Sequence, residues 1–213
     1  KYLCNRYKLN FNKKLIIFIS SFSMTNLTEY KKYFDSRVIG EEYVLKRELL
    51  DYESRMIILD WIEKYIKEND CEFIYRPHPS EYIDDNIIKI REKYFNFHII
   101  GDDSIRTWIK NCDKINIWHS TSIAEIYFMR KTCSVLRPIE MPEFLQNGIL
   151  DNAKTINTYE EFCNFNNNEV NEFPIDKDLI LEHFCIDEEK YAYEKICDLV
   201  EEIVENNIVM DLY

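Results

Sequence analysis

The sequence predicts an α/β fold, a Rossmann-like parallel sheet of about five strands flanked by helices, with a helical extension at the carboxyl end. Between residues 14 and 138, short apolar runs alternate with segments of helical period. The first run, Leu15 to Ser20, is continuously apolar up to its last residue, as in strands buried on both faces. Apolar residues make up 46% of the chain, yet no run approaches the roughly 20 residues that span a bilayer. A folded, soluble protein is expected.

Each predicted element follows from a local pattern. After the first strand, residues 21–48 are irregular in period and predict a long loop with a short helix near residues 28–33. Leu50–Asn69 is a helix, because Leu59, Ile62 and Ile66 fall on one stripe. The strand Cys71–Tyr75 ends before Pro77, which cannot continue a central ladder. The remaining elements of this region are the helix Asp84–Tyr94, the strand Phe97–Ile100, the helix Ser104–Asn111, the strand Lys114–Trp118, the helix Thr121–Arg130 and the strand Thr132–Leu136.

Three segments are expected along the chain. Residues 1–13 form a polar lead-in or linker, and residues 14–138 form the sheet domain. Residues 139–213 form a helical extension that packs on the same domain, with a short helix near residues 159–165 and a long amphipathic helix over residues 188–206.

Composition excludes several classes of site. The three glycines lie far apart, so neither a Gly-rich dinucleotide fingerprint nor a phosphate-binding P-loop is present. The seven cysteines are odd in number and no two are within three residues, which indicates reduced thiols in the cytoplasm rather than disulfides or zinc ligands. No cluster has metal-ligand spacing, so neither a metal nor a cofactor is predicted.

Charge is unevenly distributed along the chain. The net charge is −12, and residues 139–213 hold 19 acidic but only 4 basic side chains, which disfavours nucleic acid as a partner. Residues 1–50 hold 10 basic and 5 acidic side chains. This basic start is expected to face a partner domain or an anionic membrane surface.

The polar residues that follow the strands are the candidate site, because ligands of open parallel sheets bind beyond the carboxyl ends of the strands. Arg76-Pro77-His78-Pro79 follows the second strand, and its prolines hold His78 on a stiff arm. Such an imidazole can donate a hydrogen bond to a phosphate, with Arg76 adding further donors. Equally, this segment can be a rigid turn in which His78 caps the next helix.

Hydroxyl groups mark the ends of the first and fourth strands. Ser120, Thr121 and Ser122 stand at a strand-to-helix junction, where unpaired N–H groups and hydroxyls together can bind an anion, and Ser21 follows the first strand. Glu125 lies on the same helical face and could accept hydrogen bonds from a ribose diol. Helix capping and a surface glutamate are the plainer explanations.

Together these motifs resemble the carboxyl-terminal, donor-binding half of glycosyltransferase-B enzymes, above all bacterial sialyl-, polysialyl- and Kdo transferases of capsule and lipopolysaccharide synthesis. The resemblance implies that His78 acts on the phosphate of a CMP-sugar as the catalytic group. It further implies that Ser120 to Ser122 bind the same phosphate and that Glu125 holds the ribose. The sugar would pass to a glycan or glycolipid acceptor, in the cytoplasm or at the inner face of the membrane.

One departure from those families concerns catalysis. Their amino-terminal half carries an acidic motif ending in glycine that supplies the general base, and this sequence has no such tripeptide. An amino-terminal acceptor domain or a partner subunit is therefore expected to supply it. Two alternatives stay open: a CDP-glycerol or CDP-ribitol polyol-phosphate transferase, and a non-catalytic nucleotide-sugar-binding module.

Overall fold

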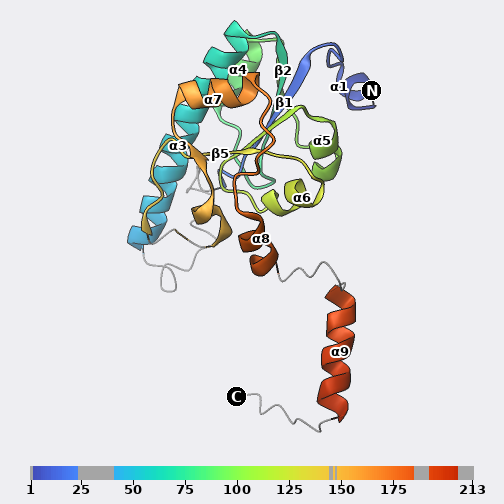
Figure 1. Cartoon of the computed structure of the whole chain (residues 1–213). Helices are drawn as coiled ribbons and strands as arrows, with labels where there is room; N and C mark the ends of the chain where they lie inside the picture. The colour runs from blue at the N-terminus through green and yellow to red at the C-terminus, as the bar shows by residue number, and fades with distance from the viewer. Residues whose placement is uncertain (1, 24–40, 144–145, 147, 185–191, 206–213) are drawn as a thin grey trace. The chain divides into compact units, whose positions relative to one another are not determined.

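A six-stranded parallel sheet forms the centre of the molecule in the computed structural model, which describes residues 2–23, 41–143, 146, 148–184 and 192–205 (Figure 1). The strand order is β3-β2-β1-β4-β5-β6, which is the doubly wound order of Rossmann folds. The strands are β1 (Lys14–Ile19), β2 (Cys71–Arg76), β3 (Phe97–Ile99), β4 (Lys114–Ile117), β5 (Ser134–Leu136) and β6 (Thr155–Ile156). The predicted fold class is thus confirmed.

The chain divides into two compact units. The first, Lys1–Pro174, holds the sheet, and the described part of the second, Ile175–Tyr213, holds two helices. Strand β6 lies beyond the five predicted strands, and its two residues are too few to form a recognisable pattern. It pairs with β5 through Val135 and Leu136.

The helices of the first unit are α1 (Tyr2–Tyr7), α3 (Glu41–Glu68), α4 (Asp85–Lys93), α5 (Ile105–Asn111), α6 (Ile123–Phe128) and α7 (Tyr159–Asn167), with a 3₁₀ turn, η2, at Ile149–Asn152. Helix α3 begins nine residues before the predicted start at Leu50, so the predicted loop is wrong over residues 41–48. The reason is visible in Leu45 and Leu49, which are exposed, so the first turns of α3 show no apolar stripe. The rest of that loop, with the helix predicted near residues 28–33, lies outside the described residues.

Helices cover both faces of the sheet (Figure 1). On one face α3, α4 and α7 lie together, and on the other α5 and α6 lie side by side. Ile16 and Phe18 of β1 contribute to the core beneath α3, and β1 is buried along almost its whole length, as the continuous apolar run predicts. Aromatic packing of Phe162 on Trp61 and Tyr65 joins α7 to α3.

The second unit consists of α8 (Lys177–His183) and α9 (Ala192–Glu205). Helix α9 confirms the helical part of the prediction over residues 188–206 as far as those residues are described, and it exposes Ile196, Leu199 and Val200. That the segment from residue 139 onward packs as an extension on the sheet domain stays a prediction. Among the described helices, none combines the length and the apolar character that crossing a bilayer requires.

Candidate functional site

The carboxyl ends of β1, β2 and β4 bring together the polar segments that the sequence singled out. Strands β1 and β4 are neighbours although far apart in sequence, because the chain returns across the sheet between β3 and β4. The His119 backbone N–H donates to Ser21 Oγ at 3.1 Å, and Ser20 Oγ lies 3.1 Å from the Tyr75 hydroxyl, within hydrogen-bond distance. Ser21 therefore lies beside the His119 to Ser122 segment at the topological switch point, where ligands of this fold class bind.

The segment after β2 is a closed turn that presents His78. The Glu81 N–H donates to the His78 carbonyl at 2.8 Å, and the His78 N–H donates back to Glu81 Oε2 at 3.1 Å. His78 Nδ1 is engaged within the turn, 2.6 Å from Ser80 Oγ and 3.2 Å from the Ser80 N–H, so Nε2 is the ring nitrogen that remains for a ligand. The alternative in which His78 caps the next helix is wrong, since Asp84 Oδ1 accepts from the first N–H groups of α4 at 3.0 and 3.3 Å.

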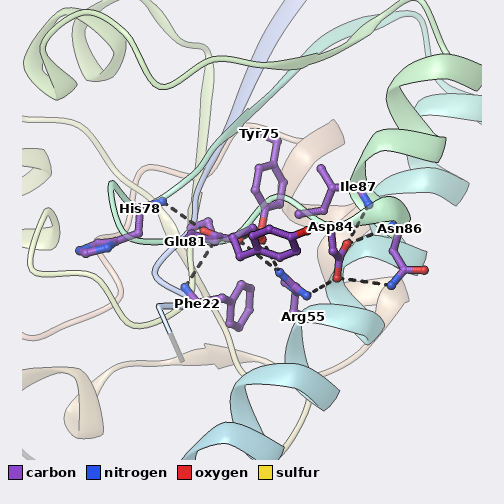
Figure 2. A network of polar contacts seen from close by, with 10 residues as sticks. Phe22, Arg55, Tyr75, His78, Glu81, Asp84, Asn86 and Ile87 are labelled. Carbon is purple, nitrogen blue, oxygen red and sulfur yellow. Dashed lines mark hydrogen bonds and ion pairs between the residues drawn. The ribbon is translucent and has the colours of Figure 1, made fainter. Parts of the chain in front are cut away.

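Behind the turn lies a buried polar network built on Glu81 (Figure 2). The Tyr75 hydroxyl donates to Glu81 Oε1, the Arg55 guanidinium lies 3.9 Å from the same oxygen, and Arg55 also pairs with Asp84. Burial raises the pKa of Glu81 to about 7, against the hydrogen bonds from its partners and the charge of Arg55. The His78 imidazole is directed away from this network, which holds only the backbone of the turn (Figure 2).

The network was not predicted from sequence. Glu81 follows the Arg76-Pro77-His78-Pro79 motif closely, yet a glutamate three residues after a histidine gives no sign that it is buried. Arg55 lies within the predicted helix and shares no motif with Glu81. Only the packing of α3 against the end of β2 brings these two charges together.

The Arg76 guanidinium binds backbone carbonyls in the loop that follows β3. Its Nη1 donates to the Asp102 carbonyl at 2.7 Å and its Nη2 to the Asp103 carbonyl at 2.8 Å. Asp103 has a φ of 62°, and Arg76 holds the loop in that conformation. Two of its donors are thus engaged by the loop after β3.

The serine segment leads into α6, which begins at Ile123, two residues after the predicted start at Thr121. Its N-cap, Ser122, has helical conformation and makes no side-chain cap hydrogen bond. Ser120 Oγ accepts from the Ser122 N–H at 3.3 Å, and Thr121 is exposed. Glu125, in the first turn of α6, lies 3.8 Å from Arg106 Nε and is half-buried. Helix capping therefore accounts for the Ser120 hydroxyl and leaves the Thr121 and Ser122 hydroxyls unexplained.

Three nitrogen-bearing side chains lie close to Trp118, those of Arg47, His119 and Arg137. Arg137 donates to the Trp118 carbonyl, and its Nη2 lies 3.3 Å from His119 Nδ1. The guanidinium carbons of Arg47 and Arg137 lie 5.3 and 5.6 Å from the centroid of the Trp118 ring. Arg47 was missed from sequence because it falls in the segment predicted as loop.

The described residues contain no group of three or more His, Cys, Asp or Glu side chains that could hold a metal ion. No family model and no curated protein matches the chain. Among solved structures, Staphylococcus aureus MnaA bound to UDP matches with 14% sequence identity and a TM-score of 0.38. The match covers 64% of this chain and 30% of that chain, and a similarity this low does not assign the chain to a family.

Proposed function

We propose that the chain is the donor-binding part of a glycosyltransferase and binds a CMP-sugar at the carboxyl ends of β1, β2 and β4. The observation that carries this proposal is the strand order, which gathers Ser21, the His78 turn and the His119 to Ser122 segment at one switch point. Such edges are where open parallel sheets bind nucleotides.

In this proposal the Nε2–H of His78 donates to the phosphate of CMP, and the Ser120 to Ser122 hydroxyls donate to the same group. Glu125 accepts hydrogen bonds from the ribose diol. The acceptor hydroxyl displaces CMP directly with inversion at the sugar carbon, and the C–O bond to the phosphate breaks as the bond to the acceptor forms. Donors at the departing phosphate stabilise its growing charge.

The other components of the reaction belong to the same proposal. The acceptor is a glycan or glycolipid of a bacterial surface polysaccharide, and an amino-terminal domain or partner subunit supplies the general base. The reaction would take place in the cytoplasm, at the inner face of the membrane, where the basic first 50 residues favour an anionic surface.

A calorimetric titration with CMP tests donor binding, with UMP, GDP and CDP as comparisons. We expect saturable CMP binding that His78→Ala weakens at least about tenfold, equivalent to about 1.4 kcal/mol. His183→Ala is the matched control, because it removes an exposed histidine from the second unit. Failure of all four nucleotides to bind, or equal CMP affinity in the His78→Ala variant, would refute the assignment.

A second candidate has a specific observation in its favour. A CDP-polyol transferase handles a donor with two phosphates and so needs more positive charge at the site, and Arg47 adds a guanidinium beside Arg137. Tighter binding of CDP than of CMP in the same titration would favour this donor.

A further inference from the structure

Arg137 is a buried guanidinium with no carboxylate partner in the part of the chain that is described. It is 6% exposed, and the described ion pairs do not include it. Burial above all, and also the charge of Arg47, lower the pKa of Arg137 to about 10, while Asp151 opposes this. A buried charge without a partner of opposite sign is costly, so such a group is retained where an anion binds or where it fixes the fold.

Arg47 places a second guanidinium in the same cluster. It projects from α3, and its Nε donates to Asp51 Oδ1 at 2.7 Å, which engages one of its five donors. Both arginines lie over the ring of Trp118, which is fully buried. The Trp118 indole N–H has no acceptor among the described residues, so donors outnumber acceptors around this ring.

His119 completes the cluster as a neutral donor. A guanidinium only donates, so its contact with Nδ1 makes that atom the acceptor and leaves the proton of the ring on Nε2. Burial and the charges of Arg137 and Arg47 lower the pKa of His119 to about 4, which keeps the ring neutral at pH 7. Ser21 Oγ already accepts the His119 N–H, so its own proton is available to donate.

We propose that Arg47, His119 and Arg137, with the Ser21 hydroxyl, form an oxyanion site at the carboxyl ends of β1, β4 and β5. Every group named offers a proton and none offers a free carboxylate, which is the chemistry of a phosphate or carboxylate site. His119 and Ser21 are half-buried, so both side chains retain some exposure to a small anion.

The identity of the ligand rests on the proposed function. The phosphate of CMP is assigned to His78, so this second site would receive the other negative group of the donor. That group is the carboxylate of an acidic sugar in a CMP-sugar, or the second phosphate in a CDP-linked donor. Both present oxygen atoms that a guanidinium fork binds.

Inorganic phosphate tests the oxyanion site without any nucleotide. At pH 7.5 and constant ionic strength, phosphate should raise the melting temperature of the wild type saturably, because it binds the native state. Arg47→Gln should lose at least half of this increase. Lys67→Gln, which removes an exposed charge from the other end of α3, should retain most of it.

Two substitutions of His119 test whether its Nε2 contributes to phosphate binding. The amide nitrogen of glutamine can take the place of Nε2, so His119→Gln should keep phosphate binding and His119→Ala should weaken it. Absence of a saturable effect in the wild type, or equal stabilisation in Arg47→Gln and the wild type, would overturn the proposal.

Nucleotide ligands distinguish the two sources of the anion. We compare CDP with CMP, and CMP-N-acetylneuraminic acid with its carboxylate methyl ester, in the wild type and in Arg47→Gln. If the site binds the second phosphate, CDP should bind the wild type about tenfold more tightly than CMP; if it binds the sugar carboxylate, the acid should bind about tenfold more tightly than its methyl ester. Arg47→Gln should remove that difference. Phosphate binding that depends on Arg47 without any nucleotide binding would support the oxyanion site and refute the donor function; CMP binding without either preference would do the reverse.

Discussion

Two histidines at the carboxyl edge have Nδ1 engaged within the protein. Ser80 contacts Nδ1 of His78, and the Arg137 guanidinium donates to Nδ1 of His119, so Nε2 is the nitrogen that each ring can offer to a ligand. The backbone N–H and Nδ1 of His119 are both bonded within the protein. Its half-buried ring leaves Nε2 as the group that can act on a ligand.

The ribose role of Glu125 is testable at the same scale. A carboxylate that accepts from both ribose hydroxyls should make the wild type prefer CMP over 2′-deoxy-CMP by about tenfold, since a hydrogen bond to a charged group contributes about 1.5 to 3 kcal/mol. Glu125→Ala should abolish this preference, as measured by calorimetry. Arg106→Gln, which removes only the contact 3.8 Å away, should keep it; equal affinities of the wild type for the two nucleotides would contradict the role.

Among the elements, the turn after β2 shows how a loop is made stiff. Two prolines limit its backbone, and Glu81 closes it from inside through the His78 N–H. Glu81 is in turn held by Tyr75 of β2 and Arg55 of α3, and Arg55 reaches Asp84 at the start of α4 (Figure 2). One buried carboxyl group thus joins a strand, a turn and two helices.

This arrangement predicts a pH dependence of stability. The native pKa of Glu81 is about 7, above its ordinary value of 4.5, so between these values the native protein holds a proton that the unfolded chain has lost. The contribution of Glu81 to stability is therefore complete below about pH 4.5 and falls as the pH rises through 7, by up to about 1.4 kcal/mol per pH unit.

Denaturant unfolding from pH 5 to 8 measures this effect. As the pH rises, the unfolding free energy of the wild type should fall relative to that of Glu81→Gln, because glutamine cannot ionise. Glu92→Gln, which changes an exposed glutamate of α4, should run parallel to the wild type. Parallel curves for all three proteins would show that Glu81 titrates normally.

In the first unit as a whole, a buried amide pair ties the last helix to the middle of the sheet. Asn116 of β4 donates to Asn166 Oδ1 of α7 at 3.1 Å, and both side chains are fully buried. Ser134 of β5 donates to Asn116 Oδ1 at 2.7 Å, and Lys14 of β1 donates to the Asn166 carbonyl at 3.0 Å. Residues 152 positions apart in the chain therefore share one contact.

Asn166→Ala should reduce the unfolding free energy by about 1 to 3 kcal/mol, since it leaves Asn116 buried without its partner. Asn164→Ala, an exposed position in the same helix, should cost much less. Chemical denaturation gives both values. If CMP binds, its affinity should be the same in the two variants, because neither residue belongs to the donor site; a selective loss in Asn166→Ala would link α7 to that site.

The sequence by itself determined the five main strands, most helices and the segments that end at the site, because buried strands and amphipathic helices leave periodic patterns in the chain. It missed β6, the start of α3 and the short helices α1 and α8. Tertiary structure alone decided which segments meet. Strand order brings Ser21 to His119, the packing of α3 brings Arg55 to Glu81 and Arg47 to Trp118, and the loop after β3 engages Arg76. These contacts join residues far apart in sequence, and no local pattern records a partner that only folding brings within reach.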